Sequence, residues 1–492
     1  MNGYYNFLNK RIYLGFPPKW NHAGLSKLWL YNLHYFDYIW PLDYSQSKQI
    51  VLGWIDKYPL LKNNVGWESY PISLRIMNWC SIFFHKFRLQ TESDERFLIK
   101  LCESIRLHAQ WLIRHMEVHL MGNHLFENAA ALVFAGSCFG DEVANGWYEK
   151  GKKILKDEIE EQILPDGMHF ERSGMYHLRI TSLLSNLLNI NNSELSDIVE
   201  PALKRMLKAL KCITHPDGDI SLFNDGVFKI YHAPKDIMNF AEELLKSDNL
   251  SFENTKTDHF SLSDAGYYGY RDSIGNYIIC DAGPIGPDYI PGHSHADIFT
   301  FELSLKGHRV IVDSGVYDYE VSQMRQYCRS TKAHNTIEID EQDQCEMWAA
   351  FRVARRGKPG NVEWKTSGNG FRLSSSHNGY KRLKGNPLHH RTFIWDKSGK
   401  LFVVDKITSK RNHTIKSRLH LHPDCEIIQI KNNAAIVKYP AGRFKITFFG
   451  AGNISIEDSF YCPEFGIRIQ NKVLVFSLLG LNIETKFQIE VL

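Results

Sequence analysis

The chain contains 492 residues, 43% of them hydrophobic, and a chain of this length buries two or three cores rather than one. Its 58 basic and 55 acidic residues leave a formal charge of +3, which excludes the strongly basic surface that binds nucleic acid. The nine cysteines include no C-x-x-C pair, so neither a disulfide framework nor a thiolate zinc site is expected.

The N-terminal residues 1–20 lack an apolar core of signal-peptide length, and no apolar run in the sequence is long enough to span a membrane. We therefore expect a protein without a membrane span. Its location is expected to be cytoplasmic for the chain as given, or periplasmic if a leader was removed. The sequence leaves the oligomeric state open.

Apolar residues recur at helical spacing from about residue 70 to residue 250. The acidic opening at 93–95 precedes the clearest of these stripes, as the first turn of a helix prefers. Many antiparallel helices with short loops predict an all-α domain. The stripes cover residues 98–112, 125–132, 178–188 and 199–210, with turn motifs LPDG at 164–167 and HPDGD at 215–219.

After about residue 255 the hydrophobic period changes to two, and turn residues separate the segments at short intervals. This pattern predicts a large antiparallel β-sandwich. The polar stretch 247–259 is the expected boundary. We predict an N-terminal helical or irregular extension over 1–65, a helical domain over 66–255 and the sandwich over 256–492. The predicted strands include 277–280, 300–305, 309–313, 401–405, 443–449 and 473–480.

Two histidines one residue apart open the segment 291–313, which then alternates apolar and polar residues and ends on Asp313. In a strand, His293 and His295 would share a face and address one site. His334 precedes a further strand, and His295, Asp313 and His334 form a plausible zinc set of two nitrogens and one oxygen. His293 then stays free for chemistry. The alternative is a group of hydrogen-bonded strand-end residues without a metal.

The helical half contains two polar clusters. Asn123, His124 and Glu127 lie in GNHLFENAAAL, where His124 and Glu127 at i and i+3 share a helix face. Glu171 and Tyr176 lie in DGMHFERSGMYH, just before the next apolar helix. Each cluster alone is typical of helix capping and satisfied interior polarity. Together with the histidine segment, they favour a catalytic site.

Amide, imidazole and phenol groups of this kind suit β-elimination from a 4-linked uronic acid. The substrate carboxylate must be neutralised before the weakly acidic C5 hydrogen can be removed, and amide and imidazole donors can do this. A base then takes the C5 proton while an acid protonates the leaving O4. Tyrosine and histidine can fill both roles, although a tyrosine base would need cationic or hydrogen-bonding help.

The sequence resembles the heparinase II/III-like polysaccharide lyases, bacterial enzymes with an incomplete (α/α) toroid followed by an antiparallel β-sandwich. The resemblance covers almost the whole chain. Its most specific motifs are GHSHADIFTFEL, VDSGVYDY and RSTKAHNTIEID in this order. The toroid motifs are weaker: GWESYPISLRIMNW, GNHLFENAAAL and DGMHFERSGMYH.

The resemblance implies that Asn123 and His124 contact the uronate carboxylate and that Tyr176 is the acid or acid/base. It implies that His293 is the partner base or a further neutraliser, depending on the C5 configuration, and that Glu127 orients His124. It also implies a mainly structural zinc on His295, Asp313 and His334. Further substrate contacts are expected from Glu171, Arg329, Trp348 and Arg75, the last of which is alternatively a buried structural arginine.

Two other readings remain open. A glycoside hydrolase on the same toroid would use two carboxylates roughly 5 to 10 Å apart, drawn from Glu127, Asp166, Glu171 and Asp225. A non-catalytic glycan-binding protein of a capsule or exopolysaccharide pathway would keep the fold without the chemistry. The expected partner in each case is an acidic, uronate-containing polysaccharide. Its identity, the endo or exo mode and the stereochemistry of elimination stay undetermined.

Overall fold

The computed structural model describes residues 3–60, 64–246 and 258–492. The chain divides into two compact units. Met1–Gln162 with Leu183–Ala202 form the N-terminal unit, and Ile163–Ser182 with Leu203–Leu492 form the C-terminal unit. The boundary expected at 247–259 lies mostly outside the described residues.

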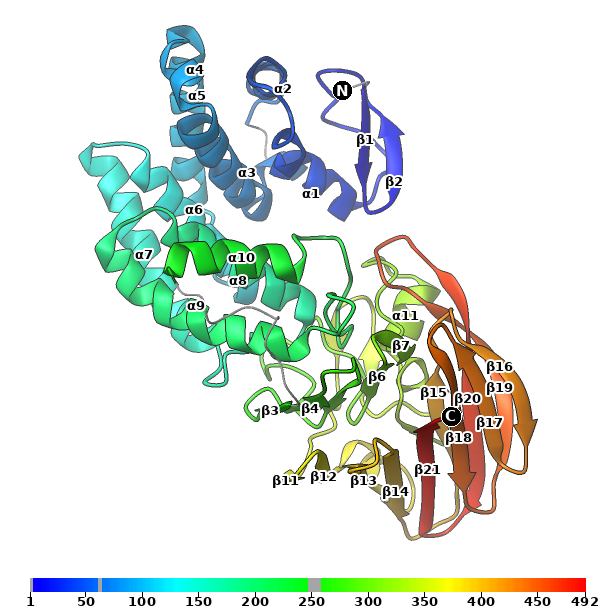
Figure 1. Ribbon diagram of the computed structural model, residues 1–492. Coiled ribbons are helices and arrows are strands. Elements are labelled where there is room, and N and C mark those ends of the chain that lie inside the picture. The colour runs from blue at the N-terminus through cyan, green and yellow to red at the C-terminus, as the bar shows by residue number, and fades with distance from the viewer. Residues whose placement is uncertain (1–2, 61–63, 247–257) are drawn as a thin grey trace. The chain divides into compact units, whose positions relative to one another are not determined.

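The N-terminal unit opens with an antiparallel hairpin that the sequence analysis did not predict (Figure 1). Its two strands pair Tyr4 with Tyr13, and helices follow. The bounds are β1 Tyr4–Phe7, β2 Lys10–Tyr13, α1 Lys27–Tyr35, α2 Tyr44–Lys57, α3 Ser69–Ser81, α4 Arg88–Glu92, α5 Glu95–Leu112, α6 Gly122–Ser137 and α7 Glu142–Gln162.

Helix α5 forms where the sequence predicts it. The Asp94 side chain accepts a hydrogen bond from the Phe97 amide and so caps the first turn. The buried face runs through Phe97, Leu101 and Ile105 to Leu112, at the spacing of one helical stripe. Helix α6 differs because it is buried on nearly every side from Gly122 to Gly136, which makes it a central helix of this unit.

Helices α7 (Glu142–Gln162) and α9 (Ser193–Ile213) each end in the same kind of turn. After α7, the amide of Gly167 bonds the Leu164 carbonyl and an isolated bridge pairs Ile163 with His169. The HPDGD turn after α9 has the same two features. The amide of Gly218 bonds the His215 carbonyl, and an isolated bridge pairs Thr214 with Ile220. The glycine in each turn has a positive φ, 91° at Gly167 and 93° at Gly218.

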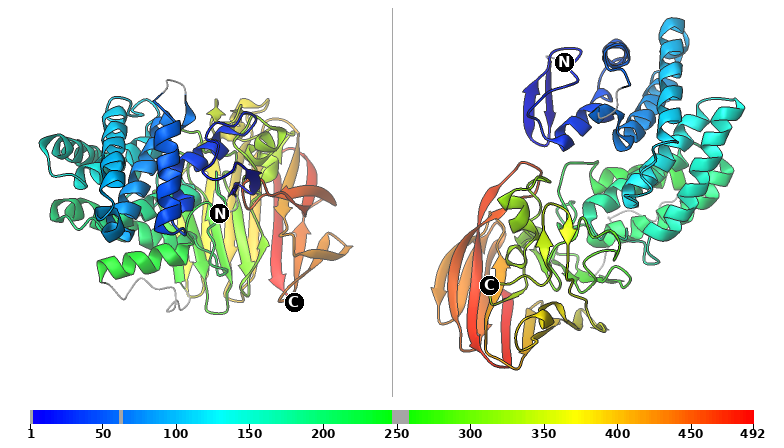
Figure 2. Two further views of the ribbon diagram at one scale, coloured as in Figure 1. Left: turned by 90° about the horizontal axis from the view of Figure 1, so that it is seen from above. Right: turned by 180° about the vertical axis from the view of Figure 1, so that it is seen from behind.

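The C-terminal unit contains antiparallel sheets, apart from one isolated parallel bridge, among its described residues. One sheet has the order β3-β4-β5-β6-β7, a second β11-β12-β13-β14-β21-β18-β17-β16, and a third β19-β20-β15-β8. The yellow-to-red strands of the larger sheets lie side by side in both views (Figure 2). The helical bounds are α8 Gly174–Leu188, which continues into the N-terminal unit, α10 Pro234–Leu245 and α11 Gln323–Arg329.

The strand bounds are β3 Asp258–Leu262, β4 Tyr267–Arg271, β5 Tyr277–Asp281, β6 Phe301–Leu305, β7 His308–Ile311, β8 Ile337–Ile339, β9 Met347–Trp348, β10 Arg352–Val353, β11 Glu363–Ser367, β12 Gly370–His377, β13 Leu388–Trp395, β14 Leu401–Thr408, β15 His413–His420, β16 Glu426–Lys431, β17 Ala434–Tyr439, β18 Gly442–Phe449, β19 Asn453–Tyr461, β20 Ile469–Gly480 and β21 Ile483–Val491. Every segment named above as a predicted strand contributes to one of these strands.

One apolar core joins the sheets of the C-terminal unit. It contains Phe301 from β6, Phe393 from β13, Phe448 from β18, Phe476 from β20 and Phe487 from β21. Because side chains from different sheets meet in this core, the predicted sandwich packing is confirmed. The order of a helical part followed by antiparallel sheets is confirmed as well. Among the described residues, no helix is both long and apolar enough to cross a membrane.

Candidate active site

The two histidines of the HSHAD motif lie in a loop of the C-terminal unit, because the chain between β5 and β6 forms no strand around residues 291–300. The predicted strand geometry is therefore wrong. The two rings meet instead at Asp225: His293 Nδ1 lies 2.7 Å from Oδ2, and His295 Nε2 lies 2.9 Å from Oδ1. The backbones interlock too, since the Asp225 amide bonds the His293 carbonyl at 3.1 Å.

Arg325 of α11 completes the surroundings of Asp225. Its Nη2 donates to Oδ2 at 2.8 Å, and its Nη1 donates to Oδ1. Asp225 is fully buried. Burial alone would raise the pKa of Asp225, but the Arg325 charge and the hydrogen bonds from both histidines hold that pKa well below its usual range. Asp225 is thus a permanently charged acceptor with four donors.

Tyr176 lies beside His293, with ring centroids 4.2 Å apart. Its hydroxyl is 3.2 Å from the hydroxyl of Tyr319. The Ser173 hydroxyl accepts a hydrogen bond from the Tyr176 amide at 3.4 Å and donates to the Asp225 carbonyl at 2.6 Å, which fixes the start of α8 against the Asp225 segment. Burial, followed by Tyr319 and nearby carboxylates, raises the pKa of Tyr176 well above its ordinary value. The phenol therefore keeps its proton.

Aromatic side chains also pack against His293. Phe351 packs edge-on against the His293 ring at 5.9 Å and against Tyr319 at 5.3 Å, while 41% of its surface stays exposed. Trp348, on the same β9–β10 hairpin, is 56% exposed. Glu171 is buried, and its Oε2 lies 3.6 Å from His293 Nε2. Exposed aromatic faces next to a buried polar group are typical of sugar-binding sites.

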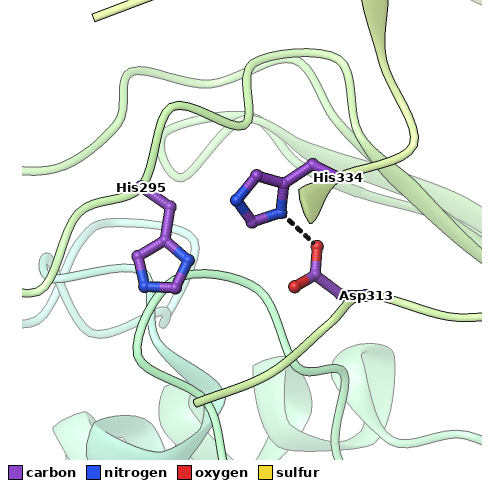
Figure 3. Close-up of side chains that lie close together, drawn as sticks. All are labelled: His295, Asp313 and His334. Carbon is purple, nitrogen blue, oxygen red and sulfur yellow. Dashed lines mark hydrogen bonds and ion pairs between the residues drawn. The ribbon is translucent and has the colours of Figure 1, made fainter. Parts of the chain in front are cut away.

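His295, Asp313 and His334 form a buried cluster whose ligand atoms all lie within 4.8 Å of one another (Figure 3). His334 Nδ1 is 2.7 Å from Asp313 Oδ2. His295 Nδ1 and His334 Nε2 are buried ring nitrogens without a hydrogen-bond partner. Buried polar atoms normally have a partner, so these two nitrogens fit a metal that two histidines and one carboxylate would hold.

The electrostatics of His295 agree with metal binding. Burial lowers the pKa of His295 to about 3, against the opposing effect of Asp225, so the ring is neutral and carries a lone pair. Its Nε2–H donates to Asp225, which is the arrangement that commonly orients a histidine ligand.

Asn123 and His124 belong to the N-terminal unit, at the start of α6. Asn123 Nδ2 donates to the Tyr70 hydroxyl at 3.5 Å, and the His124 ring packs on Tyr70 with centroids 4.4 Å apart. The carboxylate beside His124 is Glu117, whose Oε1 lies 3.1 Å from Nδ1. Glu127 is fully buried in α6, and the expectation that it orients His124 stays a prediction.

Arg75 is corrected from a substrate contact to a structural residue. Its guanidinium is fully buried in the N-terminal unit and donates to the carbonyls of His34 at 3.3 Å and Gly66 at 2.8 Å. It also stacks on Trp54, with the guanidinium carbon 4.1 Å from the ring centroid. Burial lowers the pKa of Arg75 to about 9.

Arg75→Ala is expected to lower the free energy of unfolding by about 3–5 kcal/mol, because it leaves a cavity among tryptophans and two unpaired carbonyls. Thermal unfolding measures this loss. The folded fraction should keep the KM of the wild type. Arg96→Ala, which removes an exposed arginine of α5, is the control and should leave both quantities unchanged. A raised KM at full stability of the Arg75 variant would restore the substrate-binding role.

Arg329 is likewise corrected from a substrate contact. Its side chain is buried and donates to the carbonyls of Ser294 at 3.2 Å and Ala349 at 3.2 Å. Burial lowers the pKa of Arg329 to about 10. The residue therefore ties the histidine loop to the turn between β9 and β10, the turn that carries Phe351.

Two family models match the chain: Heparinase II/III N-terminus over residues 43–250 and Heparinase II/III-like, C-terminal over residues 254–489. The chain belongs to the heparinase II/III-like family. Each of the specific motifs named above lies within the second of these matched ranges, which contains His293 and the three metal-cluster residues.

Curated relatives carry one name, heparin-sulfate lyase. The protein from Pedobacter heparinus is 26% identical over 340 residues, 63% of this chain and 47% of that protein. The protein from Bacteroides stercoris is 23% identical over 452 residues, 84% of this chain and 65% of that protein. The chain thus spans about half to two thirds of the length of these relatives.

Solved structures share the fold. A structure of heparinase III aligns with a TM-score of 0.75 at 19% identity, over 96% of this chain and 78% of that chain. A mutant heparan sulfate lyase from Pedobacter heparinus aligns with a TM-score of 0.69 at 21% identity, over 98% of this chain and 79% of that chain.

Within this heparinase II/III-like chain, two of the four carboxylates of the hydrolase reading are occupied elsewhere. Asp166 accepts the backbone amides of Met168, Asp264 and Ala265. Asp225 is buried under four donors. Neither side chain is placed to protonate a sugar or to activate water, which leaves Glu127 and Glu171 for that reading.

Three site residues escaped the sequence reasoning: Asp225 as the common acceptor, Glu117 as the partner of His124, and Phe351 as a neighbour of His293. Asp225 entered only as a hydrolase candidate. No local pattern marks it, because the partners of its carboxylate lie at least 68 residues away in the sequence. Phe351 had a weak signal, since it follows Trp348, an expected substrate contact, by three residues.

Proposed function

We propose that the protein cleaves a 4-linked, uronate-containing polysaccharide by β-elimination, with His293 as the base and Tyr176 as the acid. The observation that supports this most is the packing of the two rings, with centroids 4.2 Å apart, together with Asp225 at 2.7 Å from Nδ1 of the histidine. The Asp225 carboxylate accepts from Nδ1–H, and this tautomer places the lone pair on Nε2.

The proposed step balances within these two side chains. His293 Nε2 takes the C5 proton, and the electron pair of the C5–H bond becomes the C4–C5 double bond. The C4–O4 bond breaks, and O4 takes the proton of the Tyr176 hydroxyl. The raised pKa of Tyr176 suits a donor of this kind, because the phenol is protonated before the step begins. The phenolate and imidazolium then return to their starting states by proton exchange with water.

Asn123 and His124 are proposed to neutralise the uronate carboxylate, as the resemblance implies. The amide of Asn123 and the imidazole of His124 can each donate a hydrogen bond to a carboxylate, which makes the C5 hydrogen more acidic. The Glu117 carboxylate lies 3.1 Å from His124 Nδ1 and can orient the ring.

We also propose that His295, Asp313 and His334 hold a zinc ion. The support is the donor set and the two buried nitrogens without a partner. Such an ion would join three chain segments and serve structure rather than the elimination step, since all three side chains are fully buried. His293 stays outside this set and remains available to the substrate.

The substrate class is proposed to be an acidic glycosaminoglycan, of which heparan sulfate is the first candidate because the curated relatives are named heparin-sulfate lyases. Hyaluronan, alginate and bacterial exopolysaccharides also present a uronate and belong in the same test.

The test incubates the purified protein with a panel of these polysaccharides and follows the ultraviolet absorbance of the unsaturated uronate, with His293→Gln in parallel. We expect a rise on at least one polymer that the variant loses by roughly 10²–10⁴-fold. New reducing ends without absorbance would replace the proposal with hydrolysis. Binding of a polymer without any product would replace it with a glycan-binding role.

Phe351 is predicted to support a sugar ring of the substrate. Phe351→Ala should raise KM about three- to tenfold with little change in kcat, because a stacking contact acts on ground and transition state alike. Phe449→Ala is the matched control, since Phe449 is 42% exposed on β18 and touches no residue of the site. Steady-state kinetics on the cleaved polymer measure both constants. Equal KM values for the two variants would exclude a stacking contact between Phe351 and the substrate.

A further inference from the structure

The carboxylate of Asp225 contacts two histidines that have different proposed tasks. One oxygen holds His293, the proposed base, at 2.7 Å, and the other holds His295, a proposed metal ligand, at 2.9 Å. We propose that Asp225 is a positioning residue that couples metal binding at His295 to the orientation and tautomer of His293. This inference rests on the proposed function for the role of His293 alone.

The tautomers of the two rings explain the coupling. A metal on His295 Nδ1 requires the proton on Nε2, and this N–H then donates to Asp225 Oδ1. Without the metal, Nε2–H still donates to Asp225, but the buried Nδ1 has no partner and the ring is held on one side only. A metal on Nδ1 would hold the ring on both sides and make Nε2–H a stronger donor to Asp225. The metal therefore keeps Asp225 in the position in which its other oxygen holds His293 Nδ1–H.

The surroundings of Asp225 limit how it can respond. Arg325 binds both oxygens in a bidentate pair, and the Asp225 amide and the His293 carbonyl are joined at 3.1 Å. The Asn224 side chain accepts from the His295 amide at 3.1 Å, so the two loops are interlocked on either side of the carboxylate. In a fully buried group held this tightly, a displacement at one oxygen is transmitted to the other.

Asp225→Asn is the variant of choice because it keeps the shape of the side chain. An amide offers one acceptor and one donor, so it can satisfy only one of the two N–H groups that the carboxylate accepts. We expect zinc affinity, measured by competition with a chromogenic chelator, to fall by roughly 10–100-fold. We also expect kcat to fall with little change in KM, because the substrate does not touch Asp225.

Asp405→Asn is the matched control. Asp405 is also fully buried and also binds a histidine and a bidentate arginine, with His389 Nε2 at 2.7 Å and Arg391 Nη2 at 2.9 Å. It contacts neither His293 nor a residue of the metal cluster. The control should lose thermal stability but keep zinc affinity within about threefold of the wild type. An equal loss of zinc affinity in both variants would reduce Asp225 to a general structural role and overturn the coupling.

The second measurement needs no variant of Asp225 and no lyase activity. The ring ¹⁵N signals of histidine-labelled wild type are recorded with zinc and after chelation, and the His293 signal is the one that His293→Ala removes. We expect this signal to shift on chelation although His293 is not a ligand. A His293 signal that ignores zinc in a folded protein overturns the inference. If no polymer is cleaved, the proposed function fails while this measurement still decides the coupling.

Discussion

Replacing Tyr176 with phenylalanine is expected to lower kcat/KM by roughly 10²–10⁴-fold, the usual contribution of a positioned general acid. The substitution removes one oxygen and keeps the ring that packs on His293 at 4.2 Å. Binding should therefore change little, and the loss should appear in kcat. Steady-state kinetics by ultraviolet absorbance on the cleaved polymer measure both constants.

Tyr319→Phe is the matched control for this experiment. The two hydroxyls lie 3.2 Å apart, and burial raises the pKa of both phenols well above the ordinary value. The proposal gives the proton transfer to Tyr176 alone, so the control should lose less than about tenfold. The opposite order of losses would move the acid to Tyr319, and two small losses would remove tyrosine from the mechanism.

Removal of the metal is expected to produce a large loss of stability. An ion that binds the native state at a thousandfold excess over its Kd adds about 4 kcal/mol, which corresponds to roughly 10 °C in Tm for a domain of this size. Chelation of the wild type should therefore lower Tm by about that amount. His334→Ala should have the lower Tm from the outset and should no longer respond to the chelator.

His377→Ala controls for the loss of any buried histidine. His377 is buried in the same unit and bonds His389 at 2.9 Å, outside the metal cluster. This variant should be destabilised but should still respond to chelation. A wild type that contains no zinc after purification from zinc-supplemented medium, and whose Tm ignores the chelator, would contradict the metal proposal. The cluster would then be a hydrogen-bonded group.

The secondary structure was largely predictable because its signals are local. The stripe of α5 and the cap at Asp94 lie within nineteen residues, and the alternating segments of β14 and β18 are as short as the strands themselves. The N-terminal hairpin was missed because Tyr4–Phe7 and Lys10–Tyr13 are four-residue strands with mixed burial. Such strands carry too few alternations to stand out.

The site was predictable in its residue types and less so in its contacts. The motifs pointed to Tyr176, His293 and the cluster of His295, Asp313 and His334, whose roles stay predictions. Arg75 and Arg329 were assigned to the substrate because a sequence shows charge and hides burial. In a sequence, a buried arginine that donates to carbonyls and stacks on tryptophan cannot be distinguished from an arginine that binds substrate. Asp225 was misread for a related reason, since its partners are distant in the sequence and a carboxylate in isolation suggests acid catalysis.

The paired turns after α7 and α9 bear on how the site assembles. Each closes on itself through bonds within seven residues, and in each the aspartate also binds a β segment far away: Asp166 takes the Asp264 and Ala265 amides, and Asp217 takes Arg309 at 2.6 Å. Each turn is thus held by its own short-range bonds and by a distant segment of the β part, and the two acidic turns position the segments with Tyr176 and Asp225 against the sheets.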